Sequence, residues 1–167
     1  MSIHATFTQF RRTLLVTALV AAVAGCATVS KPVSLAETIA STPSLSTLNG
    51  LLVSSGLNAT LQATGPFTVF APSNDAFKAV PAKTMEDLSK HPDKLKSVLT
   101  YHVVAGKLMA ADVKNSNITT VNGAQAAVSK AGDFVTVENA AVTRPDLVAS
   151  NGVAHIVDTV LMPPVKK

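Results

Sequence analysis

The N-terminal segment constrains most strongly what this chain can fold into, because it decides which residues are left to fold. Arg11 and Arg12 precede an apolar run over residues 14–24, and small residues lead from this run to Cys26. A basic start, a short apolar stretch and small residues at a cleavage point are typical of an export signal. Eleven residues span only about 17 Å as a helix, whereas a bilayer core of about 30 Å needs about 20 apolar residues. We therefore predict a signal peptide over residues 1–25, which is removed, rather than a permanent transmembrane helix.

The position of Cys26 predicts a lipid anchor. The sequence Val-Ala-Gly-Cys that ends there resembles the lipobox of bacterial lipoproteins, in which the cysteine sulfur is acylated and becomes the new N-terminus. Two or three acyl chains bind a membrane far more strongly than a single myristoyl chain does. Cys26 is the only cysteine, so no intramolecular disulfide can form; the alternative is a free or buried thiol. Ala27 in place of aspartate favours the outer membrane, and both general secretion and twin-arginine export remain open.

The processed chain has the size of one domain and a nearly balanced charge. Removing residues 1–25 from 167 leaves 142, and losing Arg11 and Arg12 lowers the formal net charge from +4 to +2. A length of this order suits a single domain. With no Trp, one Tyr and no cluster of Lys or Arg, the chain lacks the basic patch and stacking aromatics of nucleic-acid binders. We therefore expect no nucleic-acid partner.

Short helices are predicted up to about residue 113, with one strand over residues 67–70 that ends at Pro72. Ser34 and Glu37 form a capping box at the first helix. Gly56 is expected to end a helix, Ser73 to be an N-cap, and Pro92 to lie in the first turn of a helix. The apolar and histidine positions that share helix faces are Leu45, Leu48 and Leu52, then Leu95, Val98, Leu99 and His102.

Antiparallel strands are predicted after residue 113. Asn122-Gly123 separates the apolar segments 118–121 and 124–128, and this dipeptide is a strong signal for a two-residue hairpin turn. A third strand is expected over residues 134–137. Asn151-Gly152 marks a second hairpin between residues 146–149 and 153–157. Helices followed by antiparallel hairpins predict an α+β domain.

Three segments, in this order, resemble the signature blocks of the fasciclin domain family. They are Gly65–Phe77, with the sequence GPFTVFAPSNDAF, then Tyr101-His102-Val103-Val104, and last Asn151–Asp158 followed by Val160–Pro163. The resemblance covers residues 33–163 and leaves 26–32 as a lipidated tether and 164–167 as a tail. It implies a wedge of two small β-sheets flanked by short helices, and a function in adhesion or extracellular binding rather than catalysis.

The resemblance also marks candidate site residues at Asn74, Asp75, Tyr101 and His102. They form either a binding face, as implied by the family's use of its Tyr-His region in recognition, or a structural hydrogen-bond cluster. In the structural alternative, the imidazole of His102 donates a hydrogen bond to the side chain of Asn74 or Asp75. His155, on its predicted strand, is expected to be a core or edge histidine.

The sequence shows neither a catalytic motif nor the residue spacing of a metal site. The sequence has no Gly-x-Ser-x-Gly elbow, phosphate loop or dinucleotide fingerprint. His155 and Asp158 are three apart, which places them on opposite faces of a strand. His91, His102 and His155 show no metal-ligand spacing. We therefore expect no enzyme, no metal site and no cofactor, with a hydrolase as the remote alternative.

Together these features predict a lipid-anchored, extracytoplasmic binding or adhesion module. Its partners are the membrane, through acylated Cys26, and a protein or glycan on a surface. The expected location is the cell envelope, most simply the outer membrane. A periplasm-facing structural or ligand-binding lipoprotein is the alternative that the sequence does not separate from a surface adhesin.

Overall fold

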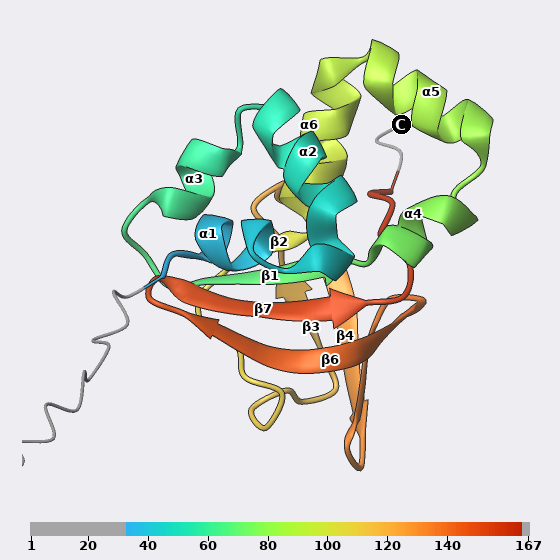
Figure 1. The fold of residues 1–167 in the computed structure, drawn as a ribbon. Helices are drawn as coiled ribbons and strands as arrows, with labels where there is room; N and C mark the ends of the chain where they lie inside the picture. Colours follow the sequence, from blue (N-terminus) through green and yellow to red (C-terminus); the bar gives the residue numbers. More distant parts are fainter. Residues whose placement is uncertain (1–32, 165–167) are drawn as a thin grey trace, which may run out of the picture.

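The computed structural model describes residues 33–164, which form six α-helices, one 3-10 helix and seven strands (Figure 1). The predicted signal peptide, Cys26, its tether and residues 165–167 of the tail lie outside the described residues. The helices are α1 (Leu35–Ala40), η1 (Pro43–Leu45), α2 (Ser46–Ser54), α3 (Asn58–Gln62), α4 (Asn74–Ala79), α5 (Ala82–Lys90) and α6 (Pro92–Tyr101). The strands are β1 (Phe67–Pro72), β2 (Val103–Ala105), β3 (Ser116–Thr119), β4 (Gln125–Ala131), β5 (Phe134–Val137), β6 (Ala140–Ala149) and β7 (Gly152–Val157).

The helix starts follow the predicted local signals. The side chain of Ser34 accepts a hydrogen bond from the backbone N–H of Glu37, and the Glu37 carboxylate accepts one from the backbone of Ser34, so the capping box is confirmed. Ser73 caps α4 through the N–H of Ala76, and Pro92 occupies the first turn of α6. None of the helices within residues 33–164 is long and apolar enough to cross a membrane.

The seven strands form one mixed sheet in the order β2-β1-β7-β6-β5-β4-β3. Both predicted hairpins form, but their turns differ from the prediction. Thr119 pairs with Gln125, so the first loop spans residues 120–124 instead of two residues. Ala149 pairs with Gly152, so the second turn is Ser150-Asn151 and Gly152 already belongs to β7. The two small sheets expected from the sequence are joined through the long strand β6, which pairs with both β5 and β7. The sheet is not antiparallel throughout, because the neighbouring strands β1 and β7 run parallel.

Gly152 explains how β1 and β7 come so close. A Cβ atom at this position would lie 2.0 Å from the backbone oxygen of Phe67 and 2.7 Å from Cδ1 of Leu35. Only a residue without a side chain allows β7 to begin against the start of β1 while α1 packs above both. The fold therefore requires glycine at the first position of β7 for its parallel pair.

Two buried clusters lie on either side of β1 and β7. The first joins helices α1 to α6 to one face of β1 and β7, through residues such as Leu35, Leu48 and Ile156. The second is enclosed where the sheet curls, and contains Phe70 and Tyr101. The edge strands β2 and β3 meet at a bridge between Val104 and Thr120. The curl places the end of α6, with Tyr101 and His102, between helices and sheet.

Candidate functional site

His102 is a buried, neutral residue that ties the end of α6 to the C-terminal segment. The residue is only 2 % exposed. The backbone N–H of Leu161 donates to Nε2 at 2.9 Å, so Nδ1 carries the proton and donates to the carbonyl of Val98 at 2.8 Å. Burial lowers the pKa of His102 from 6.5 to about 4. The expected hydrogen bond to Asn74 or Asp75 is wrong, because both imidazole nitrogens are already used by α6 and Leu161.

Tyr101 is also buried, and it faces the other side of the α6 terminus. Its hydroxyl lies 3.1 Å from the carbonyl oxygen of Gln125 and 3.3 Å from Oε1 of Glu138. Burial raises the pKa of Tyr101, and the nearby Glu138 carboxylate raises it further. Glu138 has a left-handed φ of 54° at the β5–β6 turn, and its carboxylate also accepts the N–H of Ala127 at 2.8 Å. The hydroxyl therefore helps to hold a strained turn.

Asn74 and Asp75 lie at the start of α4, where they play different parts. The amide of Asn74 donates to the carbonyl of Pro43, and its oxygen accepts the N–H of Thr47, which fastens α4 to η1 and α2. The Asp75 carboxylate is exposed and forms an ion pair with Lys78 at 2.8 Å. The structure does not bring these two side chains and the Tyr101-His102 pair into one hydrogen-bonded cluster, and only Asp75 of the four is freely accessible to a ligand.

His155 is a core histidine, as expected from its strand. Its Nδ1 accepts the backbone N–H of Asp146 at 3.2 Å, and Nε2 donates to the carbonyl of Leu108 at 2.8 Å. The imidazole stacks on Phe70 with ring centroids 5.6 Å apart. Burial lowers the pKa of His155, partly opposed by its bond to Leu108 and by the Asp146 carboxylate. Asp158 points away and accepts the N–H of Ala141, so it does not assist His155.

The described residues offer structural polar groups rather than a reactive constellation. Within residues 33–164, no buried side-chain nitrogen or oxygen lacks a hydrogen-bond partner. The same residues contain no group of three His, Cys, Asp or Glu side chains that could hold a metal ion. Burial lowers the pKa of both His102 and His155, and backbone groups occupy both nitrogens of each ring. What is accessible to a ligand is therefore the outer surface and its grooves.

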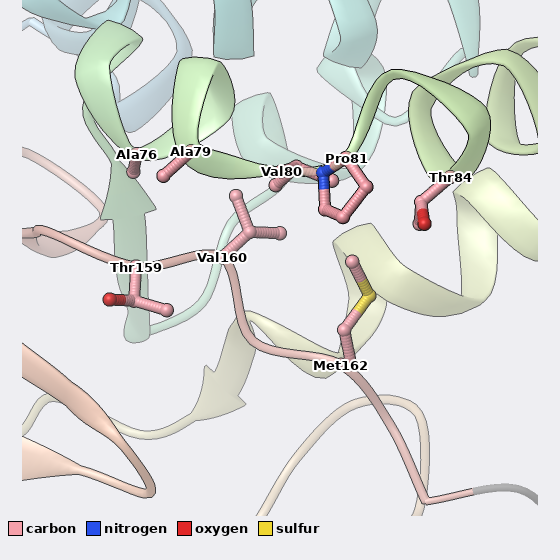
Figure 2. A pocket seen from close by; sticks show the side chains of 8 residues that line it. All are labelled: Ala76, Ala79, Val80, Pro81, Thr84, Thr159, Val160 and Met162. Atoms are coloured by element: carbon pink, nitrogen blue, oxygen red, sulfur yellow. The ribbon is translucent and has the colours of Figure 1, made fainter.

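An open apolar groove lies between the α4–α5 region and the C-terminal segment, and sequence reasoning missed it. Figure 2 shows side chains from both walls pointing toward the shared space. We call it the α4–α5 groove; it has a volume of about 330 Å³ and is lined by Ala76, Ala79, Val80, Pro81, Thr84, Thr159, Val160 and Met162. A more polar cavity of about 510 Å³, which includes Asp87 and Lys94, shares Thr84 and Met162 with it.

The sequence did not predict this groove, because its two walls are far apart in the chain. One wall comes from residues 76–84 and the other from residues 159–162. Met162, a large apolar residue near the end of the domain, is the nearest thing to a signal in the sequence. In the structure it remains 43 % exposed. An exposed methionine suits an adaptable binding surface.

The comparisons with known proteins agree with this geometry. The family model described as the fasciclin domain matches residues 43–163. Protein sll1483 of Synechocystis is 41% identical over 145 residues, which cover 86% of this chain and 81% of that protein. The cell surface glycolipoprotein MPB83 of Mycobacterium bovis is 39% identical over 100 residues, covering 60% of this chain and 45% of that protein.

A solved structure has the same fold. It is a FAS1 domain pair from the insect cell adhesion molecule fasciclin I, with a TM-score of 0.60 and 21% sequence identity. The match covers 80% of this chain and 51% of that one. At this identity the likeness concerns the fold alone.

Proposed function

The chain belongs to the fasciclin domain family, and on that premise we propose that it is a lipid-anchored, extracytoplasmic adhesion module. The observation that carries the proposal is the combination of this domain with the lipobox-like sequence before Cys26. A relative named a cell surface glycolipoprotein supports the same combination. Fasciclin homologues are adhesion and cell-surface proteins, so binding is the function that family membership supports at the coarse level.

The start of the domain is compatible with a short anchor. The carbonyl of Val33 accepts the N–H of Ser150 at 2.8 Å, so the domain begins beside the β6–β7 turn. Six residues lie between Cys26 and Val33 in the sequence, so seven residue steps limit their span to about 25 Å even at full extension. An acylated Cys26 would hold this end of the domain close to the membrane and leave the other sides available to partners.

The side chains also favour binding over chemistry. The two buried histidines bridge backbone groups and have lowered pKa values, and neither faces the α4–α5 groove. The fasciclin domain is in general a non-catalytic adhesion fold. The proposed partner is a protein or glycan surface in cell–cell or biofilm matrix contact.

Protease shaving of intact cells tests where the module works. Cells that express the full chain are treated with a protease, and a periplasmic protein serves as the leakage control. Loss of the domain while the control survives would support a surface adhesin. Protection until the outer membrane is opened would contradict the adhesin and support the alternative, a periplasm-facing lipoprotein.

A further inference from the structure

The α4–α5 groove and the tip of the β4–β5 hairpin are complementary, and we propose that the tip of one copy docks into the groove of a second copy. The inference rests on the proposed function and deepens it, because it names the partner: another copy of this chain displayed nearby. It joins two features that the fold itself leaves unused, an exposed aromatic ring and an open apolar groove.

The tip presents Phe134 to solvent. Ala131 pairs with Phe134 across the two-residue loop Gly132-Asp133, in which Gly132 has a φ of 62°. Phe134 is 79 % exposed and is the most exposed large hydrophobic residue within residues 33–164. The next residue, Val135, is buried because side chains alternate along the strand. The core therefore does not need an aromatic ring at position 134.

The groove offers the environment that such a ring lacks. Its walls are mainly apolar side chains from α4, the α4–α5 turn and the C-terminal segment, with Thr84 and Thr159 at its sides, and Met162 leaves much of its surface in water (Figure 2). A volume of about 330 Å³ lies at the small end of the range of ligand-binding cavities, which suits one aromatic side chain. Aromatic residues inserted into preformed pockets are common anchors of protein interfaces.

Charge next to each feature is also complementary. Asp133 precedes Phe134 at the exposed tip, and Lys83 lies on α5 directly before Thr84 of the groove. Both side chains are exposed, and neither takes part in an ion pair formed within residues 33–164. A docked tip would bring Asp133 toward Lys83, and such pairing favours one orientation over others.

The contact is head-to-tail rather than symmetric. In Figure 1 the β4–β5 hairpin points to the bottom of the molecule, α5 lies at the top, and the start of α1 lies on a third side, at the left. Each copy therefore carries one tip and one groove, so copies can join in rows while α1 stays free for the anchor. A single aromatic anchor gives a weak pair, and many copies held on one surface strengthen it.

Clustering of coated beads tests this contact. The full mature chain carries Cys26→Ala and is attached through its N-terminus, so that the result does not depend on lipidation. Phe134→Ser removes the aromatic ring from the tip. Ala79→Glu places a carboxylate in the groove, where it blocks the ring and repels Asp133. Both positions are exposed, and unchanged melting temperatures establish that the variants are folded. Val148→Ser is the matched control, since Val148 is another apolar residue that is 58 % exposed.

Wild-type and Val148→Ser beads are expected to cluster, whereas Phe134→Ser beads and Ala79→Glu beads each stay dispersed. Loss of the ring should weaken each contact about tenfold to a hundredfold. Mixing the two variants should restore clustering, because one keeps its groove and the other keeps its tip. Dispersed wild-type beads, clustering of Phe134→Ser beads, or a mixture no better than its components would each overturn the proposal. The bead result is independent of cellular location, so it fails separately from the shaving test.

Discussion

Acid should destabilise the domain through His102, and the size of this effect can be worked out from its burial. The pKa of His102 is about 4 in the folded chain against 6.5 for an ordinary histidine, because burial disfavours the charged ring. Between these pH values the unfolded chain binds a proton that the folded chain does not bind. The free energy of unfolding is therefore unaffected by this group above its ordinary pKa and falls as the pH drops toward 4.

Linkage converts this pKa difference into a magnitude. Relative to pH 7.5, His102 alone should lower the free energy of unfolding by about 1 kcal/mol near pH 5.5 and by about 2–3 kcal/mol near pH 4.5. The loss corresponds to charging a ring whose Nε2 must then give up the hydrogen bond from Leu161. His155, whose pKa is also lowered by burial, adds to the total in the same direction.

Urea unfolding at several pH values isolates the contribution of His102. His102→Gln keeps one donor and one acceptor but does not titrate, so its free energy of unfolding should fall by about 2–3 kcal/mol less than that of the wild type between pH 7.5 and 4.5. Val98→Ala, which removes buried apolar atoms but keeps the backbone carbonyl that the ring contacts, is the control: it should lower stability by the same amount at each pH. Parallel wild-type and His102→Gln curves down to pH 4.5 would refute the reasoning.

Three further changes probe other parts of the argument. Gly152→Ala places a methyl group 2.0 Å from the backbone oxygen of Phe67, so it should prevent folding or lower the melting temperature sharply, as read by circular dichroism; a stable variant would contradict the close β1–β7 approach. Tyr101→Phe removes a hydroxyl that bonds to Glu138 and to a β4 carbonyl, and should cost about 1 kcal/mol in urea unfolding, whereas an unchanged midpoint would show that the hydroxyl does not hold the turn. Cys26→Ala should move the protein from the membrane to the soluble fraction with the same melting temperature, and a variant that stays membrane-bound would refute the anchor.

Local signals in the sequence predicted those parts of the fold that depend on neighbouring residues. The capping box at Ser34 and the hairpin near Asn151 each depend on only a few consecutive positions. The capping box forms as expected, and the hairpin forms with its turn one residue earlier, at Ser150-Asn151. The parallel pairing of β1 with β7 was missed, because it joins residues 85 positions apart, such as Phe67 and Gly152. No local pattern distinguishes a strand that will pair in parallel at such a separation.

In the candidate site, too, the sequence indicated the residues but not their distant partners. The resemblance selected Tyr101 and His102, but their partners come from distant segments, among them Gln125 and Leu161. The proposed bond to Asn74 or Asp75 assumed that neighbouring signature blocks share hydrogen bonds. Instead, His102 satisfies the carbonyl of Val98 one turn earlier, which a residue at the end of a helix reaches without any tertiary contact.

Because Tyr101 and His102 are buried, a loss of binding caused by unfolding can be distinguished from a loss of binding caused by a missing contact. His102→Ala leaves the buried N–H of Leu161 and carbonyl of Val98 without their side-chain partner, so any loss of binding should accompany a lower melting temperature. A substitution at Phe134 removes only exposed surface, so a loss of binding should occur with the melting temperature unchanged. Binding lost at position 102 without loss of stability would mean that the ring becomes exposed to a partner. Measuring melting and clustering on the same samples therefore decides whether the family's Tyr-His element acts here as a binding face or as part of the core.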